Sequence, residues 1–265
     1  MSARELGQLA AIALEVARRG SLHALSGYRK PKTIEHKGAV DLVTNFDTAT
    51  EHAIREELVR ATPDIPVVAE EEGGAESGDR IWFVDPIDGT TNYAHGHPFW
   101  SVSVGLVERG VPVVGAVVAP ALHVEWQAWA GGPALRNGVE CRVSQEQDLG
   151  ESLLATGFPY DRRTSADNNF APFFALKLIV QGIRRCGSAA IDLCSVADGT
   201  YDGYWERRLK PWDLAAGSCI ATAAGGTVTT FEGSPIDLRA GNVVGSNGRI
   251  HELLLSELAK ARAAG

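Results

Sequence analysis

Apolar residues follow a helical period at the start of the chain and a strand-like period further on. They recur every three or four positions from residue 3 to 25, which predicts an amphipathic helix there. A second helix is expected over residues 47–61, capped by Asp47 or Thr48 and ended by Pro63. Alternating or short apolar runs then predict strands at residues 81–84, 100–107, 111–118, 123–129 and 153–156. Two hairpins are expected, at Arg109-Gly110 and at Asn137-Gly138.

The second half of the chain alternates strands with helices. Strands are expected at residues 183–186, 200–205, 227–231 and 243–245. Helices are expected at residues 188–196, 214–224 and 248–262. No linker or repeat separates these elements, so we predict one α+β domain over residues 1–265, with layers in the order αβαβα. Its N-terminal α+β half would end near residue 150, and an α/β half would follow from about residue 151.

Composition narrows the class of protein. Of the 265 residues, 45% are apolar and 22% are charged, as is usual for a soluble enzyme. The net charge of −8 comes without a basic patch, which argues against a nucleic-acid partner. The apolar runs are too short to cross a bilayer and the first residues show no signal pattern, so we expect a cytoplasmic protein with no membrane partner. The four cysteines form no CxxC pair, so a structural zinc site is not expected.

Two aspartates stand directly after an apolar strand, in the stretch WFVDPIDGTTNYAHG (82–96). Pro86 favours a tight turn there, with the carboxylates of Asp85 and Asp88 facing one point. Two adjacent carboxylates repel each other unless a proton or a cation lies between them, and hard oxygen ligands suit Mg²⁺. Gly89 permits a close backbone approach, and a helix starting there would offer amides to a phosphate.

Further acids occur upstream and downstream of this stretch. Glu70 to Glu72 follow the apolar pair Val67-Val68, and Asp213 stands at the start of a predicted helix. The segment DLVTNFD contributes Asp41 and Asp47. Each of these acids alone is more typical of a helix cap or of a solvated face.

Taken together and in order, these segments resemble the inositol monophosphatase family of Mg²⁺-dependent, lithium-sensitive phosphatases. The stretch at 82–96 is similar to the first family signature, and WDLAAGSCIATAAGG (212–226) is similar to the second. The segments DLVTNFDTATE and AEEEGG lie at the expected places upstream. The resemblance covers nearly the whole chain and implies the layered fold of inositol monophosphatases and fructose-1,6-bisphosphatases, two or three Mg²⁺ ions per site, and a homodimer.

The resemblance also implies a role for each matching residue. A first Mg²⁺ would be held by Glu70, Asp85 and the carbonyl of Ile87. A second would be held by Asp85, Asp88 and Asp213. Glu70 would also reach a third ion. Glu70, Thr90 and Asp47 would be catalytic, with Asp47 and Thr90 orienting or deprotonating the attacking water. Substrate would contact Asp88, Gly89, Thr90, Gly187, Ser188, Ala189, Glu206 and Asp213. A basic residue of the family could correspond to His36 or to Lys37, and the register leaves this open.

The expected activity is hydrolysis of inositol 1-phosphate to inositol and phosphate by a metal-activated water. The chain has no DxDx[TV] motif and no CX5R loop, so no phosphoenzyme is expected. The carboxylate of Glu206 favours a polyol because it can accept hydrogen bonds from two hydroxyls. The alternatives are histidinol phosphate, fructose 1,6-bisphosphate or phosphoadenosine phosphate as substrate. A regulatory or RNA-associated binding protein is the alternative from another class.

Overall fold

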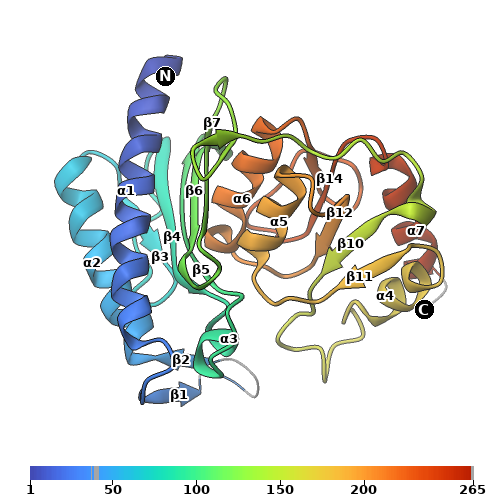
Figure 1. The fold of residues 1–265 in the computed structure, drawn as a ribbon, viewed down its shortest axis with the longest axis horizontal. Coiled ribbons are helices and arrows are strands. Elements are labelled where there is room, and N and C mark those ends of the chain that lie inside the picture. The colour runs from blue at the N-terminus through green and yellow to red at the C-terminus, as the bar shows by residue number, and fades with distance from the viewer. Residues whose placement is uncertain (37, 39–41, 264–265) are drawn as a thin grey trace.

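The computed structural model describes residues 1–36, 38 and 42–263, so Lys37 and Asp41 lie outside the described residues. Helices and sheets form five layers (Figure 1). Two helices cover one face of a larger sheet, two more lie between this sheet and a smaller one, and two cover the outer face of the smaller sheet. The αβαβα layering expected from the sequence is therefore confirmed.

The larger sheet has seven strands in chain order, from β3 to β9. Only β3 and β4 pair in parallel, and the other neighbours are antiparallel. The strands are β3 (Val67–Ala69), β4 (Arg80–Asp88), β5 (Ser101–Glu108), β6 (Val111–Ala119), β7 (Val124–Trp129), β8 (Leu135–Arg136) and β9 (Val139–Glu140).

The smaller sheet has five strands in the order β11-β10-β12-β14-β13. Its centre is mixed, because β10 runs parallel to β11 and β12 whereas β14 is antiparallel to β12 and β13. The strands are β10 (Leu153–Thr156), β11 (Gly182–Arg184), β12 (Gly203–Glu206), β13 (Thr227–Thr229) and β14 (Val243–Ser246). A separate hairpin pairs β1 (Ile34–His36) with β2 (Leu42–Thr44).

The helices fill the remaining layers. On the outer face of the larger sheet lie α1 (Ala3–Gly27) and α2 (Asn45–Ala61). Between the sheets lie α5 (Ala189–Ala197) and α6 (Pro211–Ala223). On the outer face of the smaller sheet lie α4 (Phe170–Lys177) and α7 (His251–Ala263). Short helices are α3 (Thr90–Ala94), η1 (Pro120–Leu122) and η2 (Leu149–Glu151).

Strand β4 shows why the central strands read as continuous apolar runs. Trp82 and Val84 pack toward α1 and α2, whereas Ile81 and Phe83 pack toward the helices between the sheets. A strand that is covered on both faces needs apolar side chains at every position. The same double cover buries the polar end of β4, where both aspartates lie.

Helix α6 packs closely on the larger sheet because two strand residues have no side chain. A Cβ on Gly105 would lie 2.7 Å from the Cβ of Ala215, and one on Gly115 would lie 2.4 Å from the carbonyl oxygen of Ala216. Either contact is shorter than van der Waals packing allows. These glycines let α6 approach β4, with Asp213 in its first turn.

The structure corrects three local predictions. Helix α2 is capped by Thr44, whose side chain and backbone form a capping box with Asp47, so neither Asp47 nor Thr48 is the cap. Pro86 makes no turn, because β4 continues to Asp88 with a bulge between Asp85 and Asp88. Strand β12 begins at Gly203 and not at residue 200.

The sequence predictions did not include the β1–β2 hairpin, β3, α4 or the short helices η1 and η2. Among the described residues, no helix combines the length and the apolar composition needed to cross a membrane.

Candidate active site

The bulge at the end of β4 brings both of its aspartates to one side. Asp85 lies opposite Ser103 and Asp88 opposite Ser101 on β5, so three residues of β4 match two of β5. A bulge adds a residue on one strand and re-aims the side chains around it. The Ile87 amide donates to Asp85 Oδ1 at 3.0 Å, which fixes that carboxylate within the bulge.

Asp213 completes a group of three carboxylates. Asp85, Asp88 and Asp213 each offer an oxygen atom within 4.8 Å of the others. The first two are buried and the third is half-buried at the start of α6, where the Lys210 amide donates to Asp213 Oδ2 at 2.6 Å. Residues more than 120 positions apart in the chain therefore converge on one point.

Burial and mutual repulsion raise the pKa of each member of this group. Burial, and then the charges of Glu70 and Asp88, place the pKa of Asp85 well above its ordinary value. The pKa of Asp213 is also raised well above its ordinary value, by burial and by the charges of Asp88 and Glu70. Burial raises the pKa of Asp88 to about 6 although it accepts several hydrogen bonds. Such a cluster favours a proton or a cation between its oxygens.

The segment that carries Glu70 is held by an acid that sequence reasoning did not assign to the site. Glu51 of α2 is fully buried, and its carboxylate accepts the amides of Glu71 at 2.7 Å and of Glu72 at 2.8 Å. Glu51 thereby fixes the turn after β3 in which Glu70 lies. The signal was its position four residues after Asp47, on the same face of an amphipathic helix.

A second group of contacts fixes Asp88 from the side of α5. Asp88 Oδ2 accepts the hydroxyl of Ser188, the cap of α5, and the amide of Ala190 at 2.8 Å. Gly89 has φ = 96°, and a Cβ there would lie 3.0 Å from the Gly187 carbonyl oxygen. Glycine is the residue that tolerates this conformation and leaves room for the neighbouring loop.

Thr90 and Asp47 form a buried pair next to the acidic cluster. The Thr90 hydroxyl donates to Asp47 Oδ1 at 2.9 Å or to the Ile87 carbonyl at 3.1 Å. The other carboxylate oxygen of Asp47 accepts the amide of Thr44 at 2.8 Å and the Thr44 hydroxyl. Burial raises the pKa of Asp47, which these hydrogen bonds partly offset. The pair places a polarised hydroxyl at the edge of the cluster.

A pocket of about 120 Å³ opens onto this site. All eight residues expected to contact substrate line it: Asp88, Gly89, Thr90, Gly187, Ser188, Ala189, Glu206 and Asp213. Burial raises the pKa of Glu206 to about 7, and the Tyr204 hydroxyl donates to Glu206 Oε2 at 2.6 Å. The expected ligands Glu70, Asp85 and Ile87 are absent from this lining, and His36 lines a neighbouring cavity.

The donor set suits Mg²⁺. It consists of carboxylates alone, without a cysteine or histidine in the group, and Mg²⁺ prefers such oxygen ligands. Among the described residues, no positive charge appears among the causes that set the pKa of Asp85 or of Asp213. A divalent cation would supply that charge.

Comparison with known proteins gives consistent matches over nearly the whole chain. A family model described as the inositol monophosphatase family matches residues 5–263. An inositol-1-monophosphatase of Synechocystis sp. is 43% identical, over 94% of this chain and 88% of that protein. A Nus factor SuhB of Pasteurella multocida is 37% identical, over 93% of this chain and 94% of that protein. The structure of an inositol monophosphatase from Anabaena (Nostoc) sp. PCC 7120 matches with a TM-score of 0.89 and 40% identity, over 97% of both chains.

Proposed function

This chain belongs to the inositol monophosphatase family and is a phosphatase, and from that premise we propose that it hydrolyses inositol 1-phosphate with Mg²⁺. The observation that carries the proposal is the convergence of Asp85, Asp88 and Asp213 beside the substrate pocket. This group and the pocket share two residues, Asp88 and Asp213, so a phosphate in the pocket would adjoin the cation.

We assign the metal ligands as follows. Glu70, Asp85 and the Ile87 carbonyl would hold a first Mg²⁺, and Glu70 would also reach a third ion. Asp85, Asp88 and Asp213 would hold a second. When bound, Mg²⁺ supplies charge neutralisation for the phosphoryl oxygens and lowers the pKa of a nearby water.

The protein's own groups then orient the water and the phosphate. The Thr90 hydroxyl donates its hydrogen bond to Asp47, so the lone pairs of its oxygen are left to accept a hydrogen bond from the attacking water. Asp47 holds this orientation and can receive the displaced proton, because burial raises its pKa. The backbone at Gly89 and Thr90, which lines the pocket, would contact the phosphoryl oxygens.

The leaving group would lie against Glu206. An ionised Glu206 keeps one carboxylate oxygen fixed by Tyr204 and accepts hydrogen bonds from neighbouring hydroxyls with its remaining lone pairs. Ala189 and Gly187 leave space for a ring because their side chains are small or absent. A polyol with adjacent hydroxyls is therefore the preferred leaving group.

A substrate panel tests this proposal. Phosphate release is measured with Mg²⁺ and graded Li⁺ on inositol 1-phosphate, histidinol phosphate, fructose 1,6-bisphosphate and phosphoadenosine phosphate. We expect inositol 1-phosphate to be hydrolysed, only with Mg²⁺, and Li⁺ to inhibit. A strong preference for histidinol phosphate or phosphoadenosine phosphate would replace the polyol assignment, and no release from any substrate would refute the enzyme assignment for this site.

A regulatory function with RNA is the second candidate, because the similar protein of Pasteurella multocida is named a Nus factor. Two features weigh against it. The net charge is −8, and Trp82, Trp100 and Trp205 are buried, so they offer no surface for base stacking. A gel shift with labelled RNA at low salt tests it, and strong binding together with absent phosphatase activity would favour it.

We also propose a homodimer and a cytoplasmic location. Phe174 in α4 is 64% exposed, and Leu178, which directly follows α4, is 89% exposed. An exposed apolar surface of this kind suits contact with a second copy of the chain. All four cysteines are free, as suits a reducing compartment. Light scattering on the purified protein tests the dimer, and a monomer at micromolar concentration would refute it.

A further inference from the structure

The carboxylate of Glu206 lies directly against the backbone of Gly157. A Cβ on Gly157 would overlap both carboxylate oxygens of Glu206, so only a residue without a side chain leaves room for them. Gly157 directly follows β10, whereas Glu206 is the last residue of β12, the neighbouring strand. The place of Glu206 in the substrate pocket therefore depends on how the backbone at Gly157 is held against β12.

One buried side chain, that of Asn169, joins these two segments. Its Nδ2 donates to the Gly157 carbonyl at 2.6 Å and to the Thr156 hydroxyl at 2.9 Å. Its Oδ1 accepts the indole N–H of Trp205 at 2.9 Å. Trp205 directly precedes Glu206 in the chain. The amide of Asn169 thus connects the backbone beside the Glu206 carboxylate with the residue before Glu206.

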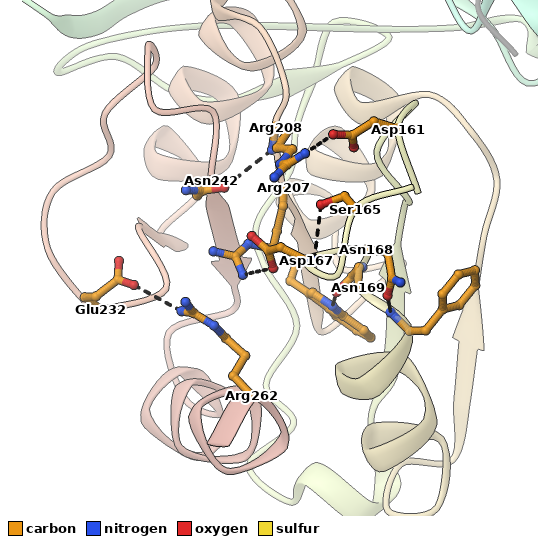
Figure 2. A network of polar contacts seen from close by, with 12 residues as sticks. Asp161, Ser165, Asp167, Asn168, Asn169, Arg207, Arg208, Glu232, Asn242 and Arg262 are labelled. Atoms are coloured by element: carbon orange, nitrogen blue, oxygen red, sulfur yellow. Dashed lines mark hydrogen bonds and ion pairs between the residues drawn. The ribbon is translucent and has the colours of Figure 1, made fainter. Parts of the chain in front are cut away.

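The residue after Glu206 is held by the same part of the loop between β10 and α4. Arg207 is buried and pairs with Asp167 at 2.5 Å, two residues before Asn169 (Figure 2). A buried ion pair of this kind is destabilised strongly when one partner is removed. Both chain neighbours of Glu206 therefore bond to side chains from residues 167–169.

A role as a helix cap does not account for the bonds of Asn169. Asparagine is a common N-cap because its side chain accepts an amide of the first helical turn. Asn169 is the N-cap of α4, yet its side chain makes no capping hydrogen bond. Its backbone has φ = 69°, a left-handed conformation in which asparagine is enriched. The side chain is used on the segments around Glu206 and not on its own helix.

We propose that Asn169 is a specificity-determining positioning residue, which joins Gly157 to Trp205 and so holds Glu206 where it accepts hydrogen bonds from the hydroxyls of a polyol leaving group. This inference rests on the proposed function, in which Glu206 meets that leaving group. Asn169 does not line the substrate pocket, so it acts through Glu206. A phosphate ester whose leaving group has no free hydroxyl should gain nothing from this positioning.

The test compares inositol 1-phosphate with 4-nitrophenyl phosphate, whose leaving group has no further hydroxyl. The ratio of kcat/KM for the first ester to that for the second is measured with Mg²⁺ in the wild type and in Asn169→Gly. Glycine adopts the left-handed backbone without strain, so this variant removes only the amide. We expect the ratio to fall about tenfold, as for one lost hydrogen bond to a charged group. The control is Asn168→Ala, which loses a bond to the Phe170 amide in the same loop and should keep the ratio.

A double variant separates positioning from a general loosening of the fold. Glu206→Gln alone should also lower the ratio, and Asn169→Gly combined with Glu206→Gln should lower it no further, because both changes remove one interaction. A double variant whose ratio falls by the product of the two single effects would overturn the inference, as would a wild-type ratio in Asn169→Gly. If Asn169→Gly does not fold, Trp205→Phe replaces it, since it removes the indole donor and should lower the ratio in the same way.

Failure of the proposed function would give a different pattern. If the wild type hydrolyses neither ester, the phosphatase assignment fails, and if it hydrolyses only 4-nitrophenyl phosphate, the polyol assignment fails. In both cases crystal structures of the wild type and Asn169→Gly decide the positioning by themselves. A Glu206 carboxylate that leaves Gly157 in the variant would support the inference, and an unmoved carboxylate would overturn it.

Discussion

At the scale of single residues, the candidate site consists of buried or half-buried acids that repel one another. Asp85, Asp88 and Asp213 lie within 4.8 Å of one another, and each has a raised pKa. Hydrogen bonds from Ser188, Ala190 and Lys210 hold their orientations without removing the repulsion. This arrangement is costly for stability and useful for binding a cation.

Replacing Asp88 with Asn removes one charged ligand and keeps the shape of the side chain. We expect Asp88→Asn to fold and to lose about 100-fold or more in kcat at saturating Mg²⁺, because a metal contributes several kcal/mol of charge stabilisation. Asp213→Asn should behave alike. Phosphate release gives the rate and circular dichroism the fold. Glu72→Gln is the control, since this side chain is exposed, and it should stay within about twofold. Near-normal turnover in Asp88→Asn contradicts the ligand assignment.

At the scale of elements, the site depends on how closely α6 lies against the larger sheet. Asp213 stands in the first turn of α6, whereas Asp85 and Asp88 stand on β4. The glycines of β5 and β6 let the helix backbone approach the strands. The packing of α6 against these glycines therefore affects both the stability of the fold and the position of Asp213.

Gly115→Ala tests this link. The new Cβ would meet the carbonyl oxygen of Ala216 at 2.4 Å, and overpacking of this kind costs about 1–3 kcal/mol. We expect a lower urea midpoint and weaker Mg²⁺ binding. Gly7→Ala in α1 is the matched control, because its Cβ would lie 3.6 Å from Trp129, and it should be neutral or stabilising. Equal urea midpoints for the two variants would contradict the prediction, because α6 would then have room to shift away from the new Cβ.

Helix α7 is attached to the smaller sheet by a buried histidine. His251 bonds to Thr229 on β13 through Nε2 at 2.9 Å and to Ser246 on β14 through Nδ1 at 2.8 Å. Burial lowers the pKa of His251 below its usual 6.5. The neutral ring is therefore part of the packing between the helix and the sheet.

The lowered pKa sets the sign of a pH effect on folding. Below about pH 6.5, His251 binds a proton in the unfolded chain but stays neutral in the folded protein. The free energy of unfolding therefore falls as the pH falls. We expect the wild type to lose more stability than His251→Gln between pH 7.5 and 5.5, by at most about 1.4 kcal/mol per pH unit. Urea unfolding at both pH values gives the difference. Parallel pH dependences in the two proteins would contradict a lowered pKa.

At the scale of the whole molecule, Mg²⁺ and protons compete for the same oxygens. The acids have raised pKa values in the folded protein, so without metal the folded state binds protons that the unfolded chain does not, and it gains stability as the pH falls from about 7 toward 4. Metal binding needs the ionised carboxylates. A cation therefore replaces protons as the stabilising charge at higher pH.

We accordingly expect Mg²⁺ to raise the Tm more at pH 8 than at pH 5.5, with the change centred near the pKa of about 6 for Asp88. Thermal unfolding with Mg²⁺ or with a chelator, at both pH values, checks this. The double variant Asp85→Asn and Asp213→Asn should show no Mg²⁺ effect at either pH. A Tm increase that is independent of pH, or one that the double variant retains, would place the stabilising ion elsewhere.

The sequence by itself determined the periodic elements and the chemical character of the site. The apolar runs of β5 to β7 and the helical spacing of α1 depend on which faces are buried, and such patterns are local. The motifs around Glu70, Asp85 and Asp213 were readable because each joins an apolar run to an acid. The bulge in β4 was not predicted because the pairing of β4 with β5 decides it. The cap at Thr44 was not predicted although its capping box with Asp47 is local.

Only the tertiary structure decided which charges stay unpaired. Glu51 reads as an ordinary helix acid, yet folding buries it under the turn of Glu70. Arg162 and Arg207 are both arginines near acids in the sequence. Arg207, directly after β12, forms an ion pair with Asp167, whereas Arg162 forms none with a carboxylate of the described residues. The physical reason is that the interaction energy of two charges depends on the distance between them. In a chain of 265 residues this distance is set only when the layers pack together.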